Sequence, residues 1–288
     1  MATLTVITLT LNEERNIVSC LETVRWADEI LVIDSGSTDA TVALARTFTE
    51  RVFTIAWEGY GAARNFALGQ AAGDWILWLD ADERLTPELA DEIREILRAN
   101  RGEVNGYAIA RRAYFLGRWI RHCGWYPGRV TRLFRKGKGR FNETRVHEHL
   151  HVEGRILRTR HDLLHLTDPD LQHYLHKFNR YTSLAAEDMV AAGRHFSLAD
   201  LLFRPPFQFV KMYLLRRGFL DGVEGLILSV LSSAYVFTKY AKLWEKTHQH
   251  RSGSAPEVPS PAGHRTTASP STPPSGDPPA RTGDSPPS

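Results

Sequence analysis

Two aspartates, Asp80 and Asp82, follow directly on an apolar run at residues 75–79 (WILWL). A run of this kind predicts a strand buried on both faces, and ligands of open α/β sheets bind beyond the carboxyl ends of such strands. In an extended chain the two carboxylates would point the same way, so a divalent cation, Mg²⁺ or Mn²⁺, would relieve their repulsion. The alternative is a solvated acidic turn before a helix that begins at Thr86.

The composition is that of a globular protein. Of the 288 residues, 42% are hydrophobic and 24% are charged, which allows one or two domains with a full core. The two cysteines, Cys20 and Cys123, supply neither a disulfide framework nor zinc-ligand spacing, so a reducing compartment is expected. The chain opens on a strand-like segment, and we expect no signal peptide.

Segments of strand and helix pattern alternate through the first 100 residues and must position the aspartates. This alternation predicts βαβ units and a largely parallel sheet. The predicted strands are residues 3–10, 29–33, 51–55 and 75–79. The predicted helices run to about Ala27, over 40–49 with Ser37 or Thr38 as the cap, from Gly59 onward, and over 86–100 with Thr86 as the cap.

The predicted strands end in polar or acidic groups instead of a glycine-rich phosphate loop. The segment after the first strand reads Leu11-Asn12-Glu13, and the sequence contains no P-loop motif. A dinucleotide or P-loop site is therefore disfavoured. A rim formed by Asn12 and Glu13, Asp34, Asp80 and Asp82, with Arg64 nearby, suits a base, a ribose and a metal-bound pyrophosphate.

Four stretches in this order resemble inverting glycosyltransferases of family 2: TLTLNEERNI, ADEILVIDSGSTDATVALA, GYGAARNFAL and GDWILWLDADERL. They cover nearly all of residues 3–100. Two segments, WADEILVIDSGSTD and RLFRKGKGRFNETRVHE, are similar to the branch that adds glucose to the lipopolysaccharide inner core. The resemblance implies the GT-A nucleotide-sugar-binding fold, an α/β fold with a mostly parallel, Rossmann-like half.

The resemblance also implies roles for single residues. Asp34 would contact the base or ribose, although it could merely close a turn. Arg64 would contact the nucleotide or its phosphates, although it could pair with Glu58. Asp80 would hold the ribose and a metal-bound water, and Asp82 would ligate the metal.

The stretch from Arg111 to Arg140 contains ten Lys or Arg residues, several aromatics, and no Asp or Glu. Such a surface suits a phosphorylated, sugar-rich acceptor, because arginine binds phosphate in bidentate fashion and aromatic rings stack on sugars. Nucleic acid is a rival ligand, but it leaves the acidic strand ends unexplained. A merely solvated basic loop is the third reading.

A second chemical stretch, residues 141–149, reads FNETRVHEH. An inverting transfer needs one base to take the proton of the acceptor hydroxyl. The resemblance places the Val-His-Glu segment here, so Glu148 is the predicted base. In an extended segment His147, His149 and His151 would share one face, which fits an exposed polar face better than a metal site.

His165 is a separate candidate, because it stands alone in the apolar stretch 163–166. It either ligates the same metal as Asp82 or is a core histidine with satisfied hydrogen bonds.

The chain is predicted to be helical from about Leu171, with a break at Arg204-Pro205-Pro206. Residues 204–217 carry four basic and three aromatic side chains and no acidic one, and residues 218–238 are strongly apolar. Because Asp221 and Glu224 interrupt that apolar stretch, it is expected to lie on a membrane surface and not to cross it. An ordinary helical subdomain that covers the sheet is the alternative.

Three regions follow from these patterns: a catalytic domain at residues 1–168, a helical, membrane-interfacial region at 169–250, and a disordered Pro- and Ser-rich tail at 251–288. The sequence predicts a metal-dependent inverting glycosyltransferase that transfers a sugar from a nucleotide sugar to an anionic glycolipid, and a UDP-sugar is the expected donor. It would act at the inner face of the cell membrane. The rivals are a polyprenyl-phosphate sugar transferase and a non-catalytic nucleotide-sugar-binding protein.

Overall fold

The structure is a computed structural model that describes residues 1–56, 59–141 and 150–249. Its main sheet has nine strands, eight of them in the order β3-β2-β1-β4-β8-β6-β11-β5 with β7 paired to β6, and a separate hairpin is formed by β9 and β10. The strands are β1 (Leu4–Thr10), β2 (Glu29–Asp34), β3 (Val52–Thr54), β4 (Trp75–Trp78), β5 (Glu83–Leu85), β6 (Val104–Phe115), β7 (Arg118–Trp119), β8 (Arg129–Arg135), β9 (Gly139–Phe141), β10 (Leu150–Val152) and β11 (Arg155–Asp168).

The predicted α/β class is confirmed, and the sheet has two different halves. The pairs β3-β2, β2-β1 and β1-β4 are parallel, as the alternation predicts. Beyond β4 the sheet is mixed, because β8 runs antiparallel to both of its neighbours while β6 and β11 are parallel. The Rossmann-like half therefore ends at β4, the strand that leads into Asp80.

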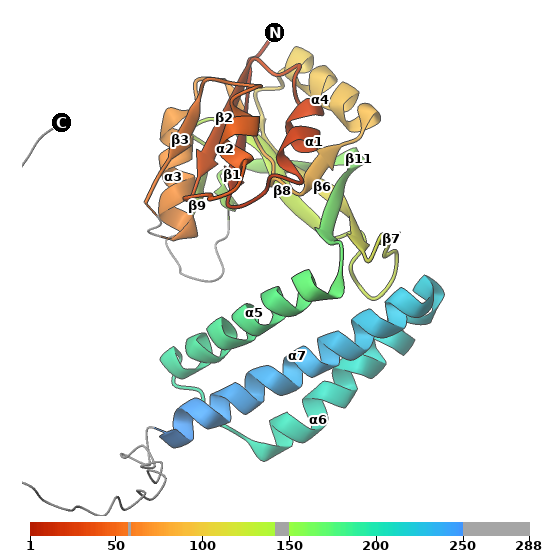
Figure 1. The fold of residues 1–288 in the computed structure, drawn as a ribbon. Helices are drawn as coiled ribbons and strands as arrows, with labels where there is room; N and C mark the ends of the chain where they lie inside the picture. The colour runs from red at the N-terminus through yellow and green to blue at the C-terminus, as the bar shows by residue number, and fades with distance from the viewer. Residues whose placement is uncertain (57–58, 142–149, 250–288) are drawn as a thin grey trace, which may run out of the picture. The chain divides into compact units, whose positions relative to one another are not determined.

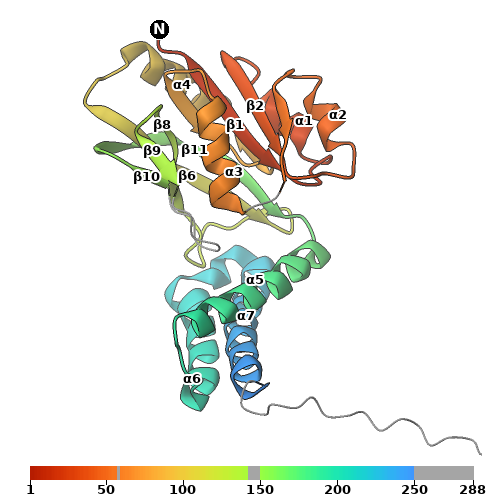
Figure 2. The same cartoon turned by 90° about the vertical axis from the view of Figure 1, so that its left-hand side faces the viewer.

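Helices cover both faces of the sheet. The core cluster on one face includes side chains of α1 (Ile17–Glu22), α2 (Thr41–Ala45) and α4 (Pro87–Ala99). The cluster on the other face includes α3 (Tyr60–Gln70) and the β9–β10 hairpin, and Figure 2 shows α3 lying along the sheet. Strand β4 is buried on both faces because it lies between these clusters.

The helix boundaries agree with the sequence only in part. The Thr86 hydroxyl accepts a hydrogen bond from the Leu89 amide, as predicted for the cap of α4. Helices α1 and α2 end earlier than predicted. The predicted cap of α2 by Ser37 or Thr38 is wrong, because the Asp39 carboxylate accepts from the Thr41 amide at 3.0 Å and the helix begins at Thr41.

The remaining elements are helical: α5 (Leu171–Ala191), α6 (Leu198–Phe209), the π-helix η1 (Val210–Leu215), the 3-10 helix η2 (Gly218–Asp221) and α7 (Gly222–Gln249) (Figure 1). The predicted break at Arg204-Pro205-Pro206 is wrong, because α6 continues through both prolines. Pro205 is buried, and its carbonyl accepts a 2.7 Å hydrogen bond from the Ser233 hydroxyl of α7. Packing against α7 thus overrides the low helix propensity of proline.

The described residues, up to Gln249, belong to one compact unit. Within it β11 ends at Asp168 and α5 begins at Leu171, so the predicted domain boundary at 168 coincides with a change from strand to helix and stays a prediction. The predicted tail, 251–288, lies outside the described residues.

Candidate active site

The turn after β4 carries the two aspartates, and they do not continue the strand. The strand ends at Trp78, and the Glu83 amide donates to the Asp80 carbonyl at 2.9 Å. The expectation that an extended chain would hold the carboxylates side by side is therefore wrong. Asp80 and Asp82 instead contact different side chains, Arg132 and His165.

Asp80 is held by Arg132 of β8. The Arg132 guanidinium forms an ion pair with Asp80 and a second one, at 2.6 Å, with Glu83, which is fully buried. The Trp78 indole N–H donates to the other Asp80 oxygen at 3.2 Å. Burial alone would raise the pKa of Asp80, but Arg132 and then Arg64 outweigh it and lower this pKa to about 2.

Glu83 and Arg132 complete a buried group of three charges. Burial raises the pKa of Glu83, whereas the two carboxylates raise the pKa of Arg132 against the effect of its own burial. Glu83 also accepts the Asp80 amide at 3.0 Å. Neither residue was predicted as part of the site. The available signal was an arginine, Arg132, directly before two apolar residues of β8, Leu133 and Phe134.

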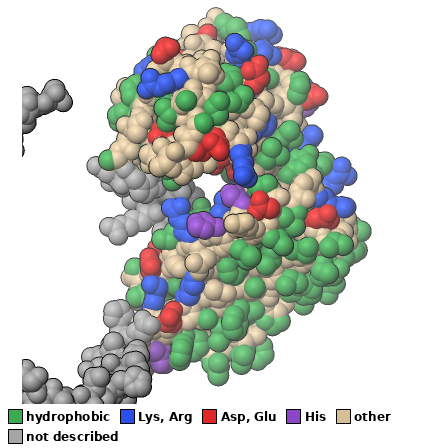
Figure 3. All heavy atoms as spheres, viewed as in Figure 1, with side chains coloured by type: hydrophobic (Ala, Val, Ile, Leu, Met, Phe, Trp, Pro, Cys, Tyr) green, Lys and Arg blue, Asp and Glu red, His purple; other side chains and the backbone are tan. Residues whose placement is uncertain are grey.

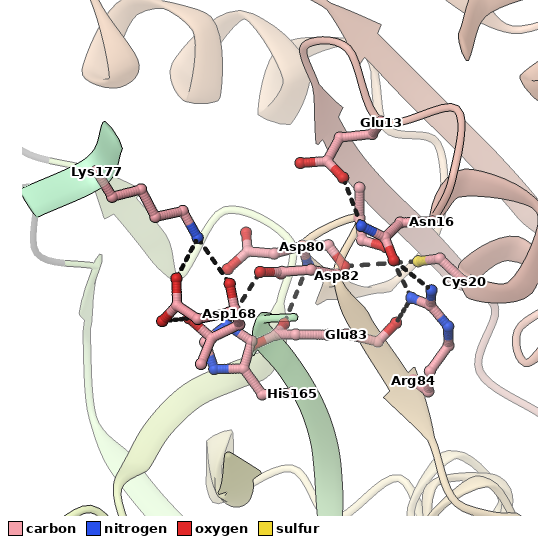
Figure 4. Close-up of polar contacts among 12 residues, drawn as sticks. Glu13, Asn16, Cys20, Asp80, Asp82, Glu83, Arg84, His165, Asp168 and Lys177 are labelled. Atoms are coloured by element: carbon pink, nitrogen blue, oxygen red, sulfur yellow. Dashed lines mark hydrogen bonds and ion pairs between the residues drawn. The ribbon is translucent and has the colours of Figure 1, made fainter. Parts of the chain in front are cut away.

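Asp82 lies beside His165 of β11. The His165 Nε2 atom is 3.3 Å from the Asp82 carboxylate (Figure 4). The Leu166 amide donates to the Asp82 carbonyl at 2.9 Å. β11 reaches the turn because it pairs with β5, where His165 is in register with Glu83. The isolated histidine of the sequence is thus at the site and not in the core.

Asp82 and His165 fit a divalent metal. Adjacent ligands of an octahedral ion at ~2.1 Å are about 3 Å apart, close to the observed separation of the two side chains. Among the described residues no group of three His, Cys, Asp or Glu side chains surrounds a common point. Two protein ligands are nevertheless sufficient for Mg²⁺ or Mn²⁺ that arrives with phosphates, because such ions keep several water or phosphate ligands.

The rim residues of the first strand bind the neighbouring loop. The Asn12 side-chain oxygen accepts the Thr38 amide at 2.8 Å, and the Asn12 amide donates to Ser37 at 2.8 Å. The Glu13 carboxylate accepts from the Asn16 amide group at 2.8 Å. Burial and then the charge of Asp82 raise the pKa of Glu13 above its usual value, so these two carboxylates share one electrostatic environment.

Asp34 is buried at the end of β2, where its carboxylate accepts the amides of Gly36 and Ser37 at 3.0 Å each. These hydrogen bonds stabilise the turn after β2, which is the alternative role that the sequence left open for Asp34. A contact with a base or ribose would be additional to them.

Arg64 of α3 lies over two aromatic rings. Its guanidinium carbon is 5.3 Å from the ring centre of Trp78 and 5.0 Å from that of Phe141. The same group contributes to the low pKa of Asp80, so it lies near the aspartate turn. Its suggested alternative partner, Glu58, is outside the described residues.

A cavity of about 220 Å³ lies between the first loop and the start of α5. Glu13, Asp82 and His173 are among the residues that line it. Next to it, the buried Asp168 pairs with Lys177 at 3.7 Å (Figure 4). Asp168 also pairs with His173 at 3.3 Å. These α5 residues were missed, since the sequence assigned the region to a separate helical part.

The predicted base, Glu148, lies outside the described residues, as do His147 and His149. The strands on either side of this segment are paired, with Phe141 opposite Leu150. Phe141 also accepts a hydrogen bond from Asn65 of α3 at 3.2 Å. His151 is exposed on β10, in keeping with the polar face that the sequence favours.

The basic and aromatic stretch, residues 111–140, contains no acidic residue, and its acidic partners come from other parts of the chain. The guanidinium groups of Arg112 and Arg121 lie over the Trp119 ring, at 5.2 and 4.3 Å from its centre. Asp162 of β11 binds Arg112 at 2.9 Å and accepts from the Tyr126 hydroxyl at 3.1 Å. Two guanidinium groups therefore lie over Trp119, and one of them, that of Arg112, is already paired with Asp162.

Known proteins resemble this chain over most of its length. The model of glycosyl transferase family 2 matches residues 5–160. The lipopolysaccharide core biosynthesis glycosyltransferase LpsC of Rhizobium meliloti (strain 1021) is 33% identical over 248 residues, which cover 82% of this chain and 90% of LpsC. An uncharacterised glycosyltransferase of Rickettsia typhi is 30% identical and covers 84% of this chain and 87% of its own length.

Among solved structures, the mannosyltransferase PcManGT from Pyrobaculum calidifontis, in complex with GDP-Man and Mn²⁺, has a similar fold. The TM-score is 0.52 at 17% sequence identity, over 85% of this chain and 88% of PcManGT. The aligned part is longer than residues 1–168, which contain all the described strands, so the likeness extends beyond the sheet.

Proposed function

The chain belongs to glycosyl transferase family 2 and is a glycosyltransferase, and from this membership we propose that it is a metal-dependent, inverting enzyme that transfers a sugar from a nucleotide sugar, UDP-linked, to an anionic glycolipid. The observation that carries the metal-dependent part is the contact between Asp82 and His165 at the end of β4. The lipopolysaccharide-core relative supports the acceptor class, and the Mn²⁺ complex of PcManGT supports the choice of ion.

The donor binds at the carboxyl ends of β1, β2 and β4. Asn12, Glu13 and Asp34 line the base and ribose side, where their hydrogen bonds already hold two loops together. Arg64 neutralises the phosphates from α3. Asp80 stays ionised because Arg132 lowers its pKa, so it can accept hydrogen bonds from the ribose at neutral pH.

Asp82 and His165 would hold the metal ion, which would supply positive charge at the leaving diphosphate. The acidic rim suits this role because a divalent cation would offset the negative charges of the carboxylates and the phosphates. Glu148 takes the proton from the attacking acceptor hydroxyl. Phe141, which precedes this segment, accepts a hydrogen bond from Asn65 of α3, the helix that also carries Arg64, and this contact supports the assignment.

The acceptor reaches the site from a membrane surface. Hydrophobic side chains gather over α6 and α7 (Figure 3), and we call this exposed set the apolar patch: Leu198, Leu202, Phe203, Phe207, Val210, Leu214, Leu215, Phe219, Leu220, Val223, Leu226, Val230, Phe237 and Trp244. Arg204, Lys211, Arg216 and Arg217 are exposed around it. Residues 201–244 contain only two acids, Asp221 and Glu224, and both pair with basic side chains. Such a surface fits an anionic bilayer.

The segment Gly218–His248 is long and apolar enough to cross a membrane by length and composition alone. The sequence argument against crossing is weakened, because Asp221 is buried and paired and so adds no exposed charge. The packing of α7 supports surface binding, since Leu228, Tyr240 and Leu243 are buried within the unit. One face of α7 therefore packs within the protein, and its exposed face is available to contact lipid.

The proposed base is tested with Glu148→Gln in an assay that separates transfer from donor binding. Transfer is expected to fall by about 10²–10⁴-fold, the usual contribution of a general base, while the affinity for UDP stays near that of wild type. An equal loss of UDP affinity would assign Glu148 to the donor site. Unchanged transfer would favour a phosphate acceptor, as in polyprenyl-phosphate transferases, which needs no base. Absence of transfer and of metal-dependent donor hydrolysis in wild type would favour a binding protein.

A further inference from the structure

Asp221 is a buried acid that the proposed chemistry does not use. Only 2% of its surface is exposed. Its carboxylate accepts the amides of Arg121 and His122 at 3.2 and 2.8 Å and lies 2.9 Å from the His122 Nδ1 atom. A buried carboxylate is costly unless it is paired, and these three contacts satisfy it. Asp221 thus connects loop 120–126, in the basic and aromatic stretch, to η2, directly before α7.

The packing around this contact is tight. The Cys123 amide donates to the Arg216 carbonyl at 3.1 Å, and Cys123 and Ile120 are buried in one cluster with Met212. A Cβ atom added to Gly218 would lie 2.6 Å from the Cys123 sulfur, which is closer than a side chain tolerates. Loop 120–126 therefore cannot shift without the helices that follow it.

The segment that holds the loop also belongs to the apolar patch. Phe219, Leu220 and Val223 lie within two residues of Asp221, and their exposed fractions are 48%, 50% and 67%. The Glu224 carboxylate, on the same turn, pairs with Arg118 of β7 at 3.6 Å. One short stretch of chain, residues 219–224, thus presents apolar side chains to solvent and also binds loop 120–126 and β7.

We propose that Asp221 is a positioning residue that couples contact with an anionic bilayer to the order of loop 120–126. The coupling rests on the proposed reaction at a membrane surface. When the apolar patch enters lipid, η2 and the start of α7 lose their freedom to move, and the three contacts of Asp221 pass that restriction to the loop. The loop is then in place for an acceptor whose lipid part lies in the same bilayer.

Hydrogen exchange on the full chain tests this coupling, with and without vesicles of phosphatidylethanolamine and phosphatidylglycerol. In the wild type, vesicles are expected to slow exchange in the peptide that contains Arg121 and His122 by about tenfold, as for an opening that becomes rarer. In Asp221→Asn this slowing is expected to disappear, although the protein still floats with the vesicles. The matched control is Asp200→Asn, which removes an acid of α6 that pairs with Arg204 and does not contact the loop.

If Asp221 had a purely structural role, Asp221→Asn would exchange faster than the wild type by the same factor with and without vesicles. That result would overturn the coupling. Retained slowing in Asp221→Asn would overturn it too. If Asp221→Asn does not fold, His122→Ala is decisive, because it removes the imidazole and keeps both backbone contacts. It is expected to retain part of the slowing, and the full wild-type effect would contradict the proposal. Failure of the wild type to float would overturn the membrane part of the proposed function, and the coupling with it.

Discussion

The imidazole of His165 lies 3.3 Å from the carboxylate of Asp82, although one residue belongs to β11 and the other to the turn after β4. Pairing of β11 with β5 brings them together, because it places His165 opposite Glu83. A nitrogen and an oxygen ligand therefore meet where the donor phosphates are proposed to bind. The histidine that stands alone in the sequence thus gains a specific partner.

His165→Ala is expected to weaken Mn²⁺ binding by about 10–100-fold, within the range found when a group that supports a metal site is lost. Isothermal titration of the variant with Mn²⁺ in the presence of UDP measures this directly. His161→Ala is the matched control, since His161 lies on the same strand and is not in contact with Asp82 in the described structure. Equal Mn²⁺ affinity in the wild type and His165→Ala would remove His165 from the metal site.

Arg132→Met is expected to destabilise the fold by about 3–5 kcal/mol, because it leaves the buried Glu83 and its neighbour Asp80 without their shared cation. Urea unfolding at neutral pH measures the change. Arg129→Met, on the same strand, removes only a 3.4 Å hydrogen bond to a carbonyl and is expected to cost little. Similar losses of unfolding free energy in the two variants would show that the buried ion pairs of Arg132 contribute no more to stability than the single hydrogen bond of Arg129.

The low pKa of Asp80 predicts a pH dependence of stability. Its folded pKa, about 2, is below the usual 3.8, so the ionised form stabilises the fold above the unfolded pKa. That contribution is lost as pH falls from about 4 to about 2. Unfolding free energies of wild type and Asp80→Asn should therefore converge over this interval. A difference that stays constant across the interval would show that Arg132 does not shift Asp80.

The apolar patch predicts binding to anionic vesicles. The double change Phe203→Ser and Phe207→Ser should release the protein, because both rings are exposed on α6 and each is worth about 1.5–3 kcal/mol when buried. Flotation with phosphatidylglycerol vesicles measures the loss. Val18→Ser is the control, since Val18 is exposed on α1, away from the patch.

Salt separates surface attachment from insertion. Attachment that depends on Lys211, Arg216 and Arg217 should weaken as the screening length falls from about 10 Å at 0.1 M salt to 3 Å at 1 M. Resistance to both 1 M salt and alkaline carbonate would instead show that α7 crosses the bilayer.

The sequence predicted the Rossmann-like half because local patterns specify it. The apolar run before Asp80 and the cap at Thr86 are short-range signals, and the structure has both β4 and α4 in place. The mixed half was not predicted, since the antiparallel pairing of β8 depends on contacts far apart in the sequence. The continuation of α6 through Pro205 likewise depends on packing against Ser233.

The same distinction holds at the site. Asp80, Asp82 and His165 could be singled out by residue type and position, but their partners could not. Arg132 was counted among the basic residues of a surface stretch, whereas it is buried between Asp80 and Glu83. A charge that neutralises a buried acid from another strand leaves no local pattern in the sequence.

Metal-dependent transfer is the central claim, and Asp82→Asn tests it most directly. The assay measures release of UDP from a UDP-sugar by the wild type and the variant, with Mn²⁺ and with EDTA, alongside a thermal melt to confirm folding. The wild type should be active only with metal, and the variant should lose about 10²–10³ in rate while remaining folded, as when one preorganised electrostatic group is removed. Full activity of the wild type in EDTA, or of Asp82→Asn in Mn²⁺, would contradict the account.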